Sequence, residues 1–255
     1  MSYGLYAAVS GSIVQEKRME ILSNNLANIN TAGFKEDRPI FREMYPKIHS
    51  TTVPTDTSIQ KSLMLTEKMN MSYLTFSGVK TDFSSGQMKH TGNPLDAAIS
   101  GPGFFVVDTP RGELYTRMGN FSLNDKSELV THEGYPLKGK GKHIKIEGTE
   151  IAIDKDGTIS VDGVRVDTLM VVDFENYSAL RKVGDNLFEN SERGNEQKAE
   201  ECEIKHQTLE LSNINIVKEM VKMIDVLRLY ESYQKVIQSL DETTSRATRD
   251  VGVVA

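Results

Sequence analysis

The sequence contains no tryptophan, a single cysteine (Cys202) and no long uninterrupted apolar run. One cysteine excludes an internal disulfide, so packing and hydrogen bonds must hold the fold. No apolar stretch approaches the roughly 20 residues that a membrane-spanning helix needs, so we expect no membrane insertion. The start, Met1–Val14, has neither a basic beginning nor a sustained apolar stretch, and we expect no cleaved secretory signal.

Positive charge is also in short supply. The chain has 30 Lys and Arg against 36 Asp and Glu, a net charge of −6 and a pI of about 5.5. No basic face is therefore expected for nucleic acid or anionic lipid. At 255 residues with 38% hydrophobic and 26% charged side chains, the chain can build one or two globular domains.

Motifs of catalytic and metal sites are equally scarce. The five histidines are not spaced as zinc ligands, and neither glycine-rich stretch (101–103, 139–142) forms a phosphate loop. Residues 154–157 resemble the start of a calcium loop, but Arg165 stands where the last acidic ligand belongs, so a hairpin turn explains them better. We predict no enzyme activity, no metal and no cofactor. A hydrolase of cell-wall sugar stays as an alternative that needs two carboxylates across a groove.

The N-terminal segment has the periodicity of a helix from about residue 3 to residue 29. Spacings of three and four residues connect Ala8, Ser12, Gln15, Met19, Leu22, Leu26 and Ile29. A neighbouring stripe contains Leu5, Val9 and Ile13. Asn28, Asn30 and Gly33 then gather where the helix would end, because Asn and Gly accept the left-handed backbone of a helix terminus.

The C-terminal segment carries two apolar stripes. The first has the three-four alternation of a coiled-coil seam: Met223, Val226, Tyr230, Tyr233, Ile237 and Leu240. Ser212, Asn213 and Asn215 are candidates for the helix N-cap. The second stripe contains Val217, Met220, Val221, Ile224 and Leu227. One partner helix covers one seam, so this wider face predicts further partners, and self-association is favoured over coverage by the middle of the chain.

The middle of the chain alternates short apolar and polar runs separated by turn dipeptides such as Asp156-Gly157 and Asp162-Gly163, as in tight hairpins. Residues 104–107 and 168–174 have the pattern of more fully buried strands. The predicted fold class is α+β. The terminal helices, in residues 1–34 and 204–255, would pair as a coiled-coil-like domain. Residues 35–75 would be an extended or partly disordered connector, and residues 76–203 a hairpin-rich β domain with a charged return connector.

Three ordered segments resemble one protein family. Residues 23–35 (SNNLANINTAGFK) are similar to the N-terminal signature of the flagellar rod and hook proteins. Residues 91–99, continuing into 101–107, 115–121 and 129–131, form a second match. Residues 209–217, followed by 230–231 and 234–237, form a third. The compact middle and residues 175–184 resemble most the proximal rod subunit that adjoins the distal rod. The distal rod subunit is the alternative within the family.

The resemblance implies a structural subunit of the rod, which transmits torque from motor to hook in the periplasmic basal body. It also implies export through the flagellar type III apparatus without a cleaved signal. The implied partners are copies of the same chain, other rod proteins and the export apparatus. A different class, a β-domain binding module with a dimerising coiled coil, stays open.

Two sets of residues would carry this function. Helix packing and subunit contacts are expected from Met19, Leu22, Leu26, Ile29, Val217, Met220, Val221, Ile224, Leu227, Tyr230, Tyr233, Ile237 and Leu240. The family motif, expected to turn the chain out of the helical tube with Phe34 as an anchor, contains Asn24, Asn25, Leu26, Ala27, Asn28, Thr31, Gly33 and Phe34. The simpler reading of this motif is a helix C-cap followed by a packed Phe.

Overall fold

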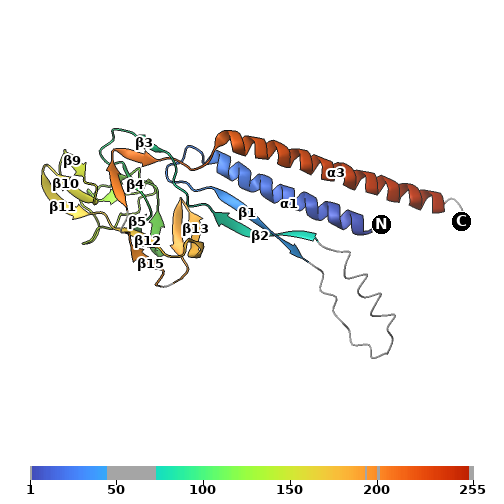
Figure 1. The fold of residues 1–255 in the computed structure, drawn as a ribbon, viewed down its shortest axis with the longest axis horizontal. Coiled ribbons are helices and arrows are strands. Elements are labelled where there is room, and N and C mark those ends of the chain that lie inside the picture. Colours follow the sequence, from blue (N-terminus) through green and yellow to red (C-terminus); the bar gives the residue numbers. More distant parts are fainter. Residues whose placement is uncertain (1, 45–72, 193, 200–201, 253–255) are drawn as a thin grey trace, which may run out of the picture. The chain divides into compact units, whose positions relative to one another are not determined.

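The computed structural model describes residues 2–44, 73–192, 194–199 and 202–252. A helix lies at each end of the chain and β structure lies between them, which confirms the α+β prediction (Figure 1). The chain divides into two compact units. Unit 1 contains Met1–Leu26, Asp37–Lys80 and Ile216–Ala255, and unit 2 contains Ala27–Glu36 and Thr81–Asn215. None of the described helices is apolar enough over a sufficient length to cross a membrane.

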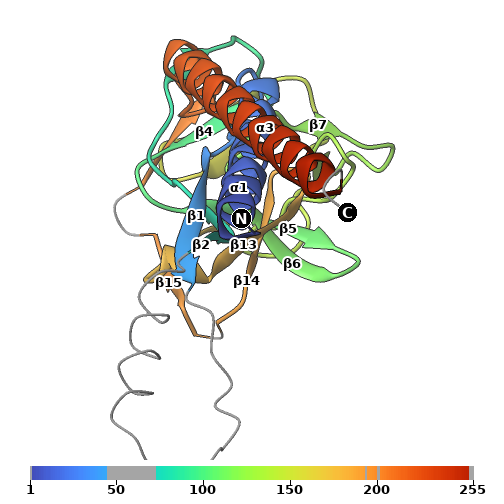
Figure 2. The same cartoon turned by 90° about the vertical axis from the view of Figure 1, so that its right-hand side faces the viewer.

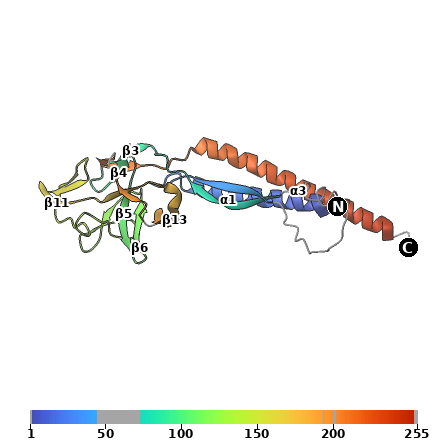
Figure 3. The same ribbon diagram turned by 60° about the horizontal axis from the view of Figure 1, so that its bottom comes forward.

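Unit 1 is built around two antiparallel helices, α1 (Ser2–Ala27) and α3 (Ile216–Gly252). They run side by side, and the start of α1 lies at the same end of the pair as the end of α3 (Figures 1 and 3). A Cβ atom placed on Gly11 would lie 2.4 Å from the ring of Tyr233, and one on Gly4 would lie 3.8 Å from Leu240. Seven residues along α1 thus correspond to seven residues in the opposite direction along α3. Glycine at position 11 gives the tyrosine ring the room it occupies.

A two-stranded sheet, β1 (Asp37–Met44) with β2 (Tyr73–Thr81), accompanies α1 (Figure 2). The guanidinium of Arg18 lies 4.8 Å above the ring of Phe41. The Asn25 side chain donates to the carbonyl oxygen of Asp37 at 2.9 Å and accepts from its amide at 3.0 Å. Part of the predicted connector 35–75 is therefore a strand attached to the end of α1. The Ser/Thr-rich stretch of that connector lies outside the described residues.

Unit 2 is centred on an antiparallel six-stranded sheet with the strand order β13-β14-β6-β5-β12-β15. Its strands are β5 (Phe104–Thr109), β6 (Gly112–Thr116), β12 (Val171–Phe174), β13 (Leu180–Gly184), β14 (Leu187–Asn190) and β15 (Glu196–Lys198). The smaller sheets use β3 (Met88–His90), β4 (Ala97–Ser100), β7 (Ser122–Leu123), β8 (Leu129–Val130), β9 (Ile151–Ile153), β10 (Thr158–Val161), β11 (Val164–Thr168), β16 (Glu203–His206) and β17 (Thr208–Glu210). A short 3-10 helix, η1 (Tyr177–Ala179), precedes β13.

Both faces of the central sheet are covered. On β5, Phe105 and Val107 enter a large aliphatic core, whereas Phe104 and Val106 enter a smaller aromatic core on the opposite face. A strand buried on both faces needs a continuous apolar run, and residues 104–107 supply one, as predicted. The predicted hairpin at Asp162-Gly163 is also present: both residues have positive φ and connect β10 to β11.

The predicted boundaries of the helical unit are wrong at both ends. The prediction includes residues 204–215 in this unit, but β16 pairs with β4, β17 pairs with β3, and the helix begins only at Ile216. Ile204 is buried in the aliphatic core, which keeps this segment in unit 2. At the other end, α1 stops at Ala27, and residues 27–36, including Ile29, belong to unit 2 because Gly33 and Phe34 pack there.

Candidate functional site

The two stripes of α3 differ in exposure. Of the seam residues, Val226 is buried at 7% exposed, and the remaining five are partly buried. The second stripe faces outward, with exposed fractions of 40–67%: Val217, Met220, Val221, Ile224 and Leu227. Five aliphatic or Met side chains on one helix face are thus left in water within a single chain.

The outer face of the first half of α1 is apolar and uncharged. Ala8, Val14 and Leu22 are buried, and Met19 and Leu26 are partly buried. The exposed side chains of the first half of the helix include Leu5, Tyr6, Val9 and Ile13. No charged residue occurs from Ser2 to Gln15. A helix surface without charge over four turns is unusual for a face that water covers permanently.

The family motif ends α1 and enters unit 2. The amide of Thr31 donates to the carbonyl oxygen of Asn28 at 3.1 Å, and its hydroxyl contacts the Asn28 side chain at 3.2 Å. Gly33 has φ +67°, and a Cβ there would lie 2.4 Å from the backbone of Arg117. Both the dihedral angle and the close approach require glycine. Phe34 is buried, with the ammonium of Lys182 4.0 Å from its ring centroid.

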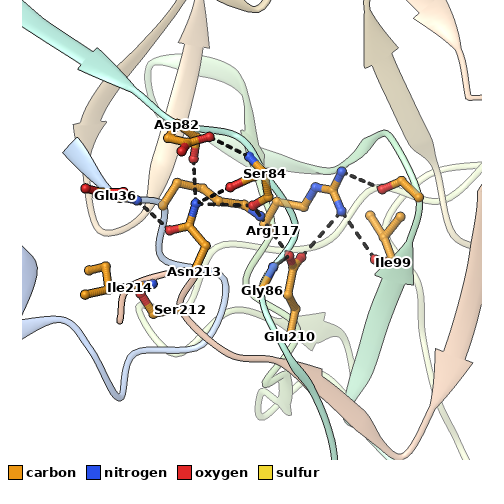
Figure 4. A network of polar contacts seen from close by, with 12 residues as sticks. Glu36, Asp82, Ser84, Gly86, Ile99, Arg117, Glu210, Ser212, Asn213 and Ile214 are labelled. Atoms are coloured by element: carbon orange, nitrogen blue, oxygen red, sulfur yellow. Dashed lines mark hydrogen bonds and ion pairs between the residues drawn. The ribbon is translucent and has the colours of Figure 1, made fainter. Parts of the chain in front are cut away.

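Directly after the motif lies a buried ionic cluster that no sequence pattern predicts (Figure 4). The Glu210 carboxylate, 1% exposed, accepts hydrogen bonds from the Lys35 ammonium at 2.7 Å and the Gly86 amide at 2.7 Å. It also pairs with the Arg117 guanidinium at 3.4 Å. Arg117 donates further to the carbonyl oxygens of Ile99 and Gly101. One carboxylate therefore joins segments that are far apart in the sequence.

Asn213 makes a second junction beside the first (Figure 4). Its Oδ1 accepts from the amide of Glu36 at 2.7 Å, and its Nδ2 donates to the carbonyl oxygens of Asp82 at 2.9 Å and Ser84 at 3.2 Å. The amide of Asp82 in turn donates to the Glu36 carbonyl at 2.8 Å. The sequence predicts Asn213 as a candidate for the helix N-cap. In the structure its side chain bonds to two other chain segments.

Burial dominates the electrostatics of the cluster. It lowers the pKa of Lys35 below its usual value, and the attraction of Glu210 opposes this effect only in part. Burial lowers the pKa of Arg117 in the same way, again opposed by Glu210. The Arg117 guanidinium also lies 5.1 Å from the Phe104 ring centroid. The two cations thus depend on one carboxylate, on carbonyl oxygens and on an aromatic face.

The described residues offer little for catalysis. No group of three or more His, Cys, Asp or Glu among them is arranged to hold a metal ion. A shallow depression on unit 2 brings Asp108 and Glu128 together, but His143 lies between them, 3.1 Å from Asp108 and 3.9 Å from Glu128. The Glu210 cluster is inaccessible to a substrate. The apolar helix surfaces and the buried junction are features of an assembling structural protein.

Comparisons with known proteins identify the family of structural proteins to which this chain is similar. Residues 5–35 match the model "Flagella basal body rod protein", residues 98–161 "Flagellar hook protein FlgE/F/G D1 domain", and residues 205–250 "Flagellar basal body rod FlgEFG protein C-terminal". The chain is 32% identical to the flagellar basal-body rod protein FlgF of Caulobacter vibrioides over 257 residues, covering 100% of both.

Two further relatives are named FlgG. The chain is 34% identical to that of Caulobacter vibrioides, over 93% of this chain and 95% of the relative. It is 32% identical to that of Bacillus subtilis, over 95% and 96%. The chain belongs to the family of flagellar basal-body rod proteins, as the ordered motifs of its sequence predicted. Members of this family are structural proteins and not enzymes.

Proposed function

We propose that this rod protein polymerises through the apolar faces of α1 and α3 into the shaft that transmits torque from the flagellar motor to the hook. Within one subunit, the two helices would pair along the Met223–Leu240 seam in a coiled-coil-like way. Neighbouring subunits would cover the faces that remain exposed, and unit 2 would form the outer part of the shaft.

The observation that carries this proposal is the second stripe of α3. Its five side chains are 40–67% exposed. Full burial of such a side chain is favourable by about 1.5–3 kcal/mol, so about half of that remains available for each on assembly. Five residues then supply on the order of 4–7 kcal/mol per subunit from this stripe alone. This contribution supports self-association repeated along a polymer.

The uncharged face of α1 supports the same function. A charged residue in a fully packed helix layer would need a buried partner of opposite charge. Residues 2–15 contain no charged residue, so they can be packed on all sides without such a partner. The Gly4–Leu240 and Gly11–Tyr233 contacts, seven residues apart on each helix, support the heptad-like pairing.

A triple substitution of Val217, Val221 and Ile224 to Ser tests the proposal. The helix content of the purified chain should stay within the range of a control in which Glu231, Lys235 and Gln238, exposed on the same helix, become Ser. Cells with the stripe variant should lack complete rods and should not swim, whereas control cells should swim. Normal rods built from the stripe variant would refute the proposed interface.

Within the rod, we place this subunit in the proximal segment that adjoins the distal rod. The compact middle and residues 175–184 support this position, and the similarity to proteins named FlgG keeps the distal position as the alternative. Family membership also supports export through the flagellar type III apparatus. Labelling of the subunit in isolated basal bodies distinguishes the two positions, and retention of the chain in cells without a working export apparatus tests the route.

A further inference from the structure

The chain passes between its two units four times, and three of these passages begin at the buried junction of unit 2. Glu36 directly precedes Asp37, the first residue of β1. Asp82 follows Lys80, the last residue of unit 1 in β2, by two positions. Asn213 precedes Ile216, the first residue of α3, by three positions. An extended residue spans about 3.4 Å, so each connecting segment is at most about 10 Å long.

At these passages, the segments are bonded to one another and not only to the core. Glu36 bonds to both Asp82 and Asn213 through its backbone, and Asn213 bonds to Asp82 through its side chain. The Lys35 ammonium donates to Ser84 at 2.8 Å and to Glu210, which also accepts from the Gly86 amide. A pull on one passage is therefore shared with the other two.

Residues 27–36 form a short segment of unit 2 between two segments of unit 1. Hydrogen bonds and burial hold this segment in place as well. The Gly33 amide donates to the carbonyl oxygen of Glu210 at 2.8 Å. Phe34 and Lys35 are both buried. Within unit 1, the two hydrogen bonds between Asn25 and Asp37 connect the residues on either side of this segment. Residues 33–35 cannot move without breaking hydrogen bonds to Glu210, and the two flanking residues, Asn25 and Asp37, cannot separate without breaking the two hydrogen bonds between them.

Stability alone is a weak explanation for this arrangement. Two buried cations and one carboxylate carry a desolvation cost, and apolar residues of similar volume often stabilise a core as well or better. Buried ionic groups do fix geometry, because an unpaired charge in the interior is costly and alternative positions are excluded.

From this geometry we propose that Lys35, Arg117, Glu210 and Asn213 act as positioning residues. They form the joint through which twisting force passes between unit 2 and the chain segments that enter the helical unit. The proposal rests on the rod function above, in which force enters the subunit through its helices. It assigns to the polar cluster a mechanical role that the apolar interfaces do not have.

Hydrogen–deuterium exchange of the full-length purified chain tests the joint without any assembled rod. Glu210→Gln keeps the shape of the side chain and removes its charge. Amides at the passages, in residues 33–36 and 81–87, should exchange at least tenfold faster. Amides of β5 and β6 should also exchange faster in Glu210→Gln, because this variant lowers the stability of unit 2 as a whole. A second variant, Asn213→Ala, leaves all charges in place. It should loosen the amides at the passages and leave those of β5 and β6 unchanged. Glu113→Gln, at the exposed pair with Lys138, is the matched control.

A swimming assay in media of rising viscosity gives the mechanical readout. Cells with Asn213→Ala should build rods and swim in dilute medium, but lose speed at least twofold more steeply than control cells as viscosity rises. Unchanged exchange at the passages in both variants, or exchange in Asn213→Ala that rises equally throughout unit 2, would overturn the joint. Equal dependence on viscosity would overturn its role in force transmission. Absence of rods in Asn213→Ala cells would also overturn the proposal, since the joint would then be needed for assembly itself.

Discussion

The charge balance of the Glu210 cluster predicts an asymmetry between two substitutions of one ion pair. Glu210→Gln leaves Lys35 and Arg117 buried without a carboxylate. Removal of one partner from a buried pair costs about 3–5 kcal/mol, because an uncompensated charge stays in the interior. We expect unit 2 to lose about this much free energy of unfolding.

Lys35→Met should cost much less. Glu210 keeps Arg117 and the Gly86 amide as donors. The lowered pKa of Lys35 shows that burial of its charge already opposes folding, and this cost disappears with the charge. The loss is then that of its hydrogen bonds to Glu210 and Ser84, about 1–2 kcal/mol in all. The double substitution should cost less than the sum of the two single ones.

Urea unfolding of the full-length chain, followed by circular dichroism of the β structure, measures these differences. Glu113→Gln at the exposed pair with Lys138 should change the free energy by less than about 1 kcal/mol. If Lys35→Met lowers the free energy of unfolding as much as Glu210→Gln, then the two buried cations do not depend on the single carboxylate of Glu210, and the predicted asymmetry is refuted.

Three further outcomes follow from single positions. Gly33→Ala should destabilise unit 2 by about 2–4 kcal/mol in a thermal melt, because its φ of +67° and the backbone 2.4 Å away leave no room for a methyl group. Gly11→Ala should lower the protection of the helix amides in hydrogen exchange, because the added methyl group displaces the Tyr233 ring. Gly4→Ala should raise this protection slightly, because its methyl group would lie 3.8 Å from Leu240 and alanine favours the helix. The opposite order of the two effects would contradict the antiparallel contact. Burial and a hydrogen bond to a carboxylate raise the pKa of Tyr177 to about 12 from an ordinary 10.0, so its contribution to stability is present below pH 10 and is lost as the pH rises towards 12. A spectroscopic titration in which Tyr177→Phe does not remove a late-ionising phenol would refute this assignment.

The sequence predicted most of the framework. Three-four spacing in both terminal segments predicted the helices, and the Asp-Gly turns and apolar runs of the middle predicted the hairpins and buried strands. Each of these features depends on residues that are close together in the sequence. The division of α3 into a less exposed seam and an outward stripe also follows its sequence pattern. Which molecule covers that stripe stays a prediction.

The junction could not be predicted in the same way. Lys35, Arg117 and Glu210 look like surface charges in the sequence, since isolated charges are usually exposed. Their burial depends on strand β17 pairing with β3, a contact between residues more than a hundred positions apart. A second long-range pairing, of β16 with β4, explains the misplaced boundary at residue 204, which periodicity near the helix did not reveal. The glycine at position 33 is a local signal of close packing.

The hydrogen bond between Asn213 and Asp82 has a consequence for how such proteins diversify. Because the main β segment enters and leaves at one point, its size is independent of the geometry of the helices. An ancestral chain could enlarge, shrink or exchange the whole insert, and the polymerising ends would still meet their neighbours unchanged. The helix contacts proposed above would then be the same in subunits whose β inserts differ in size.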